Sequence, residues 1–364
     1  MTITKEQILQ ALGNVEEPDL KKDLVTLNMI QDIQIDGNRV SFSVILTTPA
    51  CPLKAMIENA CRNAISYFVS KDAEVHINMT SHVTTQKNTG VPGVKNIIAV
   101  ASGKGGVGKS TVAVNLALGL AKAGSKVGLI DADIYGPSIP IMFGLENARP
   151  KAGKTDEGKT RIEPIEKYGV KLLSIGFFTD PNQPVPWRGP MVSTAVKQLF
   201  NDGDWGELDY LVVDLPPGTG DIHITITQSF PVTGAVIVTT PQNVALADAK
   251  KGIGMFMMDA INVPILGIVE NMSYFTPAEL PDNKYYIFGQ GGGQKLAEQL
   301  DVPFLGEIPL VKGISDSGDA GTPIVLDEST VQSKAFMAMA QKIAQQVSIA
   351  NAKILISQTN IVNN

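Results

Sequence analysis

The first 80 residues alternate between helical and strand-like spacing of their apolar side chains. A helix is predicted over residues 4–12, where Gly13 ends it, and a second has apolar positions three and four residues apart between residues 56 and 68. Three segments rich in β-branched residues are bounded by turn-forming residues, as is typical of strands: 25–35, 40–46 and 73–79. The pattern predicts a small α+β domain over residues 1–80.

Residues 81–95 are polar and include the turn-forming sequence Thr89-Gly90-Val91-Pro92-Gly93. We interpret this segment as a linker between two domains.

From residue 96 the apolar positions gather into short continuous runs, separated by longer segments with helical spacing. Strands that are apolar throughout are typical of a parallel sheet covered by helices on both faces. Residues 96–350 are therefore predicted to form a doubly wound α/β domain. Its predicted strands are 97–101, 127–130, 211–213, 235–238, 265–269 and 304–305.

A last helix is predicted after a cap at Ser329 or Thr330. Its apolar face consists of Phe336, Ala340, Ile343, Ala344 and Val347. For residues 351–364 we expect a loose tail.

Composition narrows the class of protein. Hydrophobic residues make up 44% of the 364 residues and charged residues 18%, which fits a globular chain and excludes a disordered one. With 30 basic and 36 acidic residues the net charge is −6, so we expect neither nucleic acid nor a membrane as a partner. The amino terminus lacks the apolar stretch of a signal peptide, and we expect a cytoplasmic protein.

A glycine-rich loop lies between the strand 97–101 and a helix that runs to about residue 123. Its sequence is Gly103-Lys104-Gly105-Gly106-Val107-Gly108-Lys109-Ser110-Thr111. Glycines let successive backbone N–H groups point at one phosphate, and the start of the helix adds partial positive charge. Lys109 is placed to reach the β- and γ-phosphates, and the Ser110 hydroxyl to bind Mg²⁺. The loop predicts a nucleoside triphosphate site.

Acidic residues follow two of the predicted strands. Asp214 comes directly after strand 211–213, and Asp131 and Asp133 follow strand 127–130. Because the carboxyl ends of parallel strands meet at one edge of the sheet, these carboxylates are expected beside the phosphate loop. We predict a magnesium site of Ser110, Asp133 and Asp214, with Asp133 also polarising the attacking water.

Longer motifs carry a family resemblance. The segment from Gly103 through Asp133, with Lys104 as a second lysine, resembles the deviant Walker A ATPases, which include MinD, ParA and the nitrogenase iron protein. Four further motifs resemble the Mrp/ApbC family of iron-sulfur cluster carrier ATPases: residues 131–138 (DADIYGPS), 187–191 (WRGPM), 214–221 (DLPPGTGD) and 270–274 (ENMSY). The amino-terminal unit, with Thr48-Pro49-Ala50-Cys51-Pro52, resembles the small iron-sulfur assembly domain of bacterial members.

The resemblance implies a homodimer that encloses two ATP molecules and hydrolyses them slowly. By this analogy Lys104 reaches the partner subunit's phosphates and joins Lys109 and Asp133 as catalytic residues. Asp221 lies in a switch segment that responds to the nucleotide, and Asn271 contacts adenine. The implied function is delivery of iron-sulfur clusters to apoproteins or assembly factors.

The chain departs from this family in its cysteines. Family members hold a Cys-x-x-Cys after the ENMSY segment, and two subunits together bind one [4Fe-4S] cluster through it. This chain has only Cys51 and Cys61, and Glu279 and Asp282 in that segment are hard ligands that suit such a cluster poorly. The usual bridging cluster is therefore in doubt.

Cys51 is the remaining candidate for a cluster-binding or reactive thiol. It precedes Pro52, so we expect it at or beside a helix N-cap, where the helix terminus would lower the pKa of the thiol. An inert cap is the alternative reading. Cys61 lies on an apolar helix face and is predicted to be buried.

Three functions stay open at this point. The first is an ATPase that carries clusters, and the second is a nucleotide-gated adaptor without a cluster of its own. The third is a positioning ATPase of the MinD/ParA type, which would need a basic surface or a basic amphipathic end. Only Lys334, Lys342 and Lys353 are available near the carboxyl terminus, which argues against the third. His223, two residues after Asp221, is either a sensor of the switch or a structural residue.

Overall fold

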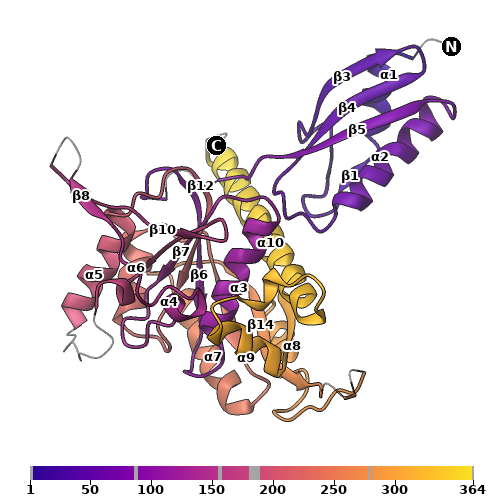
Figure 1. Ribbon diagram of the computed structural model, residues 1–364. Helices are drawn as coiled ribbons and strands as arrows, with labels where there is room; N and C mark the ends of the chain where they lie inside the picture. Colours follow the sequence, from indigo (N-terminus) through magenta and orange to yellow (C-terminus); the bar gives the residue numbers. More distant parts are fainter. Residues whose placement is uncertain are drawn as a thin grey trace. The chain divides into compact units, whose positions relative to one another are not determined.

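The computed structural model describes residues 3–85, 89–154, 158–179, 189–277, 279–280 and 282–362, except for the side chains of residues 189–190 and 355–362. Trp187 and Arg188, in one of the family motifs, lie outside the described residues. The chain forms two compact units, Met1–Thr84 with Asn351–Asn364, and Thr85–Ala350 (Figure 1). The division at Thr84 falls within the predicted linker 81–95.

The smaller unit is a three-stranded sheet packed against two helices. In the sheet order β3-β4-β5, β3 runs antiparallel to β4, and β5 runs parallel to it. Apolar side chains from both helices and from β4 share one core. The elements are α1 (Lys5–Leu12), β1 (Glu16–Glu17), β2 (Lys22–Asp23), β3 (Ile30–Asp36), β4 (Arg39–Leu46), α2 (Lys54–Phe68) and β5 (Glu74–Ser81).

Helix α1 begins where the sequence predicted a helix. Thr4 is its N-cap, and the Thr4 hydroxyl accepts a hydrogen bond from the N–H of Gln7, while the Gln7 side chain accepts one from the N–H of Thr4. This reciprocal pair satisfies two N–H groups that the helix itself cannot. The predicted strand 25–35 starts only at Ile30, because Asn28 takes a left-handed conformation with φ 54° in a preceding turn.

The larger unit is built on an eight-stranded sheet in the order β10-β11-β7-β12-β6-β13-β14-β15. Every neighbouring pair is parallel except β10 with β11. The strands are β6 (Val94–Ala101), β7 (Val127–Asp131), β10 (Ile165–Lys167), β11 (Val170–Ser174), β12 (Leu208–Asp214), β13 (Gly234–Thr239), β14 (Ile265–Phe275) and β15 (Phe304–Leu310), and a separate hairpin joins β8 (Ala152–Lys154) to β9 (Thr160–Ile162).

Helices cover both faces of this sheet (Figure 1). Buried side chains of α5, α6, α7 and α8 form one core with alternate strand residues such as Ile97 and Ala99. On the other face α3 contacts β6, β7 and β12, and α10 packs on α3 at Gly119. The helices are α3 (Lys109–Lys122), α4 (Ile139–Met142), α5 (Gly189–Asn201), α6 (Asp221–Ser229), α7 (Asn243–Phe256), α8 (Gly292–Gln299), α9 (Lys312–Asp319) and α10 (Val331–Val362), with short 3-10 turns η1 (Ile175–Phe177) and η2 (Ile324–Leu326). The predicted doubly wound α/β domain is confirmed.

The expectation of a loose tail is wrong for the residues that the structure describes. Helix α10 continues through Asn351 to Val362, because residues 331–362 contain neither glycine nor proline to end it. The cap was predicted correctly, since the Thr330 hydroxyl accepts a hydrogen bond from the N–H of Ser333 at 3.1 Å. Within the described part of the chain, no helix has the length and apolar character needed to cross a membrane.

Candidate nucleotide-binding site

The glycine-rich loop leaves β6 at the centre of the sheet and enters α3 at Lys109. Gly106 and Gly108 both have φ 81°, a left-handed conformation that favours glycine. A Cβ atom on Gly108 would lie 2.1 Å from Nδ2 of Asn271, and one on Gly103 would lie 2.2 Å from the backbone oxygen of Asp248. The loop therefore passes closely between α7 and Asn271 of β14. A cavity of about 220 Å³ opens at the loop, lined by Gly106, Lys109, Ser110 and Asp133 among others.

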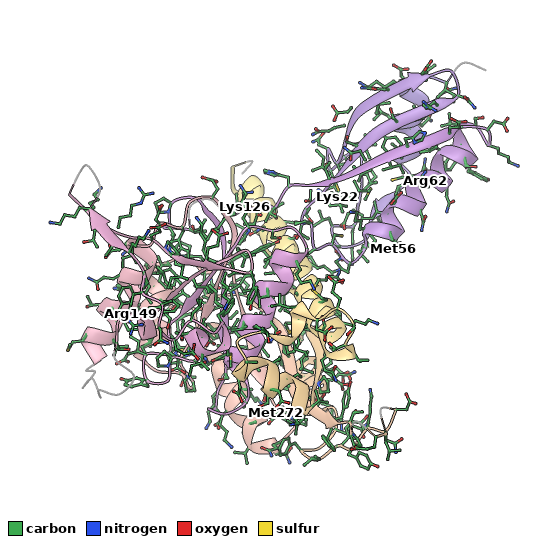
Figure 2. All side chains as sticks on the ribbon, in the orientation of Figure 1. Lys22, Met56, Arg62, Lys126, Arg149 and Met272 are labelled. Carbon is green, nitrogen blue, oxygen red and sulfur yellow. The ribbon has the colours of Figure 1, made fainter. Side chains whose placement is uncertain are left out.

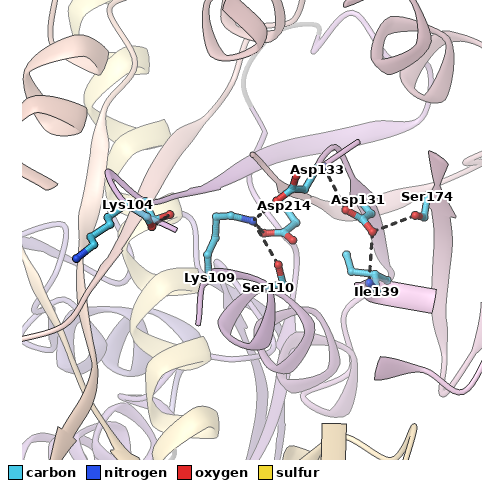
Figure 3. Close-up of polar contacts among 9 residues, drawn as sticks. Lys104, Lys109, Ser110, Asp131, Asp133, Ile139, Ser174 and Asp214 are labelled. Carbon is cyan, nitrogen blue, oxygen red and sulfur yellow. Dashed lines mark hydrogen bonds and ion pairs between the residues drawn. The ribbon is translucent and has the colours of Figure 1, made fainter. Parts of the chain in front are cut away.

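Lys109 is the buried centre of the site. Its Nζ atom lies 2.6 Å from Oδ1 of Asp214 and 3.9 Å from Oδ2 of Asp133, and it donates to Oγ of Ser110 at 3.3 Å (Figure 3). Lys109 is 6% exposed and Asp214 is fully buried. Residues from β12, from the segment after β7 and from the start of α3 thus meet at one point, as their positions at the carboxyl edge of the sheet predicted.

Of the three acidic side chains, those of Asp131 and Asp214 are fully buried and that of Asp133 is half-buried. Burial raises the pKa of Asp214 and of Asp133, and the ammonium of Lys109 opposes that rise in both. Burial also raises the pKa of Asp131, and the neighbouring carboxylate of Asp214 adds to the effect. Because one lysine faces the two carboxylates of Asp133 and Asp214, a further cation would be favoured at the site.

An orphaned oxygen supports a magnesium ion at this place. Oδ2 of Asp214 is buried and has no hydrogen-bond partner among the described residues. The Ser110 hydroxyl and the carboxylate of Asp133 are further oxygen ligands of the kind that Mg²⁺ prefers. These residues fit a magnesium ion that accompanies a nucleotide.

The remaining predicted residues of the nucleotide site occupy distinct positions. Lys104 is exposed and points away from Lys109 (Figure 3). Asn271, 5% exposed, donates its amide to the backbone oxygen of Val107 at 2.8 Å. Asp221 is the exposed first residue of α6. The Asn271 contact holds β14 against the phosphate loop.

Some features of the site had no sequence prediction. Met272 has φ 55°, a strained conformation for a residue with a side chain, and it lies at an irregular part of β14 directly after Asn271 (Figure 2). Ser174, on β11, donates to Asp131 at 2.9 Å. Asp131 was predicted because it is a polar residue at the end of an apolar run. Ser174 has the same kind of position, but Lys171 interrupts the apolar run before it, so the strand was not recognised.

The two cysteines lie in the smaller unit. Helix α2 begins at Lys54 with Leu53 as its N-cap, so Cys51 lies outside the helix terminus. The expectation of a lowered pKa is wrong: burial raises the pKa of the Cys51 thiol, and the acidic Glu17 and Asp19 add to the rise. Cys61 is fully buried, as predicted, and its pKa is raised to about 12 by burial.

Among the residues that the structure describes after β14, none replaces the missing Cys-x-x-Cys. Glu279 and Asp282 are exposed there. Across the described ranges, no three His, Cys, Asp or Glu side chains are grouped so that they could hold a metal ion.

Comparison with known proteins identifies the family. The NUBPL iron-transfer P-loop NTPase family, of the ParA group, matches residues 93–346, and an iron-sulfur cluster assembly protein family matches residues 5–77. The chain belongs to the iron-transfer P-loop NTPase family. The resemblance drawn from the motifs is thereby confirmed.

Relatives in this family match along nearly the whole chain. An iron-sulfur cluster carrier protein of Synechocystis is 49% identical over 353 residues, which cover 96% of this chain and 99% of the relative. One of Deinococcus radiodurans is 46% identical and covers 98% and 99%. Among solved structures, a nucleotide-binding protein of Archaeoglobus fulgidus in complex with ADP is 39% identical, with a TM-score of 0.55, and covers 66% of this chain and 90% of its own.

Proposed function

We propose that this protein binds and slowly hydrolyses ATP, and that it carries iron-sulfur clusters to apoproteins or assembly factors. The observation that carries the proposal is the grouping of Lys109, Asp133 and Asp214 around one cavity at the glycine-rich loop. The chain belongs to a family of iron-transfer NTPases, and similar relatives are named iron-sulfur cluster carriers. Both findings support the proposal that the cargo is an iron-sulfur cluster.

Each of these residues would have a different part in ATP hydrolysis. Lys109 lines the cavity, where it would contact the phosphates of a bound nucleotide and stabilise the charge that develops on the γ-phosphoryl group. Asp133 would accept a hydrogen bond from the attacking water and orient it in line with the leaving group. Bound Mg²⁺ would neutralise phosphate charge, held by Ser110, Asp214 and Asp133.

Lys104 is proposed to act on a second copy of the chain. Its side chain is exposed and turned away from its own site, so its charge is available to a partner subunit's nucleotide. A homodimer would then complete each site from both protomers, in the manner of an arginine finger supplied in trans. Asp221 and Asn271 are proposed as the switch residue and the adenine contact.

Hydrolysis is tested with Lys109→Ala in the full chain. We expect ATP hydrolysis in the presence of Mg²⁺ for the wild type, and a loss of at least about 100-fold for the variant. Lys250→Ala, which removes an exposed lysine from α7, is the matched control and should keep wild-type activity. A wild-type protein without hydrolysis at saturating ATP would contradict the enzymatic part of the proposal.

Cluster carriage is proposed to depend on Cys51. A dimer of this chain holds two copies of each cysteine, and Cys61 is enclosed in the core of the smaller unit, so only Cys51 can approach a cargo without unfolding. Its raised pKa means that it is a thiol at neutral pH until iron displaces the proton.

Anaerobic reconstitution tests this role. Iron and sulfide are counted per dimer for wild type, Cys51→Ala and Cys61→Ala, and transfer to an apo acceptor is then followed. We expect loss of cluster only in Cys51→Ala, with Cys61→Ala as the control for removal of a thiol. Equal cluster content in all three proteins would reject Cys51 as the ligand.

A second candidate function is a nucleotide-gated adaptor that holds no cluster of its own. The absence of cysteine from residues 62–364 favours it. Reconstituted wild-type protein without iron or sulfide, but with ATP-dependent binding to an assembly factor, would identify the adaptor.

A further inference from the structure

Three neighbouring strands end in a row of buried polar side chains. Ser174 on β11 pairs in register with Asp131 on β7, and Asp131 pairs with Asp214 on β12. All three residues are fully buried. Asp214 contacts Lys109 directly. Ser174 lies two strands away from Asp214 and has no part in the proposed chemistry.

The Ser174 hydroxyl has a fixed orientation. It donates to Oδ2 of Asp131 at 2.9 Å (Figure 3). It also accepts from the N–H of Gly176 at 3.0 Å. Because the N–H of Gly176 occupies the oxygen's acceptor side, the hydroxyl proton is directed at the carboxylate.

Asp131 passes this restraint to the loop of residues 133–139. Its Oδ1 accepts from the N–H of Asp133 at 3.2 Å, and its Oδ2 accepts from the N–H of Ile139 at 3.3 Å. Both ends of the loop are therefore attached to one buried carboxylate. The loop carries Asp133, whose carboxylate faces Lys109 across 3.9 Å.

Packing supports the same loop from the other side. The 3-10 turn η1 follows Ser174 directly, and a Cβ atom on Gly176 would lie 3.1 Å from Cβ of Pro137 and 3.2 Å from Cγ of Pro140. Ser174 is the N-cap of η1. One hydroxyl thus sets the position of both the carboxylate that holds the loop and the turn that packs against it.

We propose that Ser174 is a positioning residue for ATP hydrolysis, acting through Asp131 to hold Asp133 in place. The proposal rests on the proposed function. Removing the hydroxyl would leave Asp131 with its bonds to the loop but without the donor that fixes its rotamer, so the loop would gain freedom. The phosphate loop and Lys109 make no contact with Ser174 in this chain of hydrogen bonds, so nucleotide binding would be retained.

Ser174→Ala tests the role by separating the two kinetic constants. We expect kcat for ATP hydrolysis to fall about tenfold, with KM for ATP within about twofold of wild type. Ser333→Ala is the matched control, because Ser333 is also buried and its hydroxyl donates to the backbone oxygen of Val325 at 3.0 Å, away from the site. A merely structural effect would lower the stability of both variants and leave kcat unchanged in both.

Hydrogen exchange supplies a readout that needs no activity. In the nucleotide-free full chain, the amides of Asp133 and Ile139 should exchange about tenfold faster in Ser174→Ala than in wild type, and at the wild-type rate in Ser333→Ala. Unchanged exchange of these two amides, or a uniform increase along the chain, would overturn the positioning role. If wild type does not hydrolyse ATP, the proposed function fails, and exchange alone decides the role of Ser174.

Discussion

Gly108 is a residue at which geometry excludes every side chain. Its φ of 81° strains any L-residue, and an added methyl would meet the Asn271 amide at 2.1 Å. Gly108→Ala should therefore weaken nucleotide binding by at least about tenfold, because Asn271 of β14 must move away from the loop.

Gly106 offers a matched control for Gly108. It has the same φ of 81°, but no atom lies within 4 Å of the position of an added Cβ. Titration calorimetry of both alanine variants with ATP separates backbone strain from the clash. If both variants lose the same affinity, the contact with Asn271 has no influence on binding.

The burial of His223 predicts how the stability of the fold depends on pH. It is 1% exposed, and burial lowers its pKa from 6.5 to about 4. The unfolded chain takes up a proton between these values and the folded chain does not, so stability is unaffected above about pH 6.5 and falls as the pH drops toward 4. The free energy of unfolding should decline with a slope of up to about 1.4 kcal/mol per pH unit in that window.

Urea unfolding of wild type and His223→Gln between pH 7 and pH 5 checks this expectation. The variant should show a shallower decline, since it lacks the group that titrates. Parallel declines in the two proteins would assign the acid sensitivity to other groups.

The residues of the site were partly predictable. Lys109, Asp133 and Asp214 could be placed together because strand ends of a parallel sheet share one edge, whatever the strand order. The bond from Ser174 to Asp131 could not, because it requires β11 to lie beside β7, and nothing local in the sequence specifies that neighbour. The pKa of Cys51 was mispredicted because α2 begins beyond it and burial outweighs any effect of the helix terminus.

At the scale of elements, helix α1 depends on its first turn. The reciprocal bonds between Thr4 and Gln7 predict that Thr4→Ala destabilises the smaller unit by about 1 kcal/mol, while Thr4→Ser, which keeps the hydroxyl, costs a few tenths. Chemical unfolding, followed by a probe in the smaller unit, measures both. An equal loss in the two variants would show that the methyl group rather than the hydroxyl matters.

Helices and strands could be predicted from the sequence where the pattern of apolar residues was uninterrupted. Strands β6, β7, β12, β13 and β14 are buried on both faces, so their apolar runs were unmistakable. Strand β11 was missed because Lys171, which donates to the backbone oxygen of Trp205 at 2.8 Å, breaks the apolar run. The end of α10 was missed because the predicted apolar face was followed only to Val347, although residues 351–362 contain no glycine or proline that would stop a helix.

At the scale of the whole molecule, mixing two inactive variants tests whether each site is built from two chains. Lys104→Ala keeps its own Asp133, and Asp133→Asn keeps its own Lys104, so a mixed dimer contains one site with both intact residues if Lys104 acts in trans. Equal mixing should restore about a quarter of wild-type hydrolysis, since half of the dimers are mixed and one of their two sites works. If the mixture stays inactive while native mass spectrometry detects mixed dimers, Lys104 acts within its own chain.

The ion pair between Lys109 and Asp214 couples two binding equilibria. In the nucleotide-free protein the lysine neutralises a fully buried carboxylate. A phosphate that attracts the lysine leaves that carboxylate without a counter-charge, which is costly in a buried setting unless a cation takes the lysine's place. Nucleotide and magnesium must then increase each other's affinity by the same factor. We therefore expect the site to respond to the magnesium complex of the nucleotide rather than to either component alone.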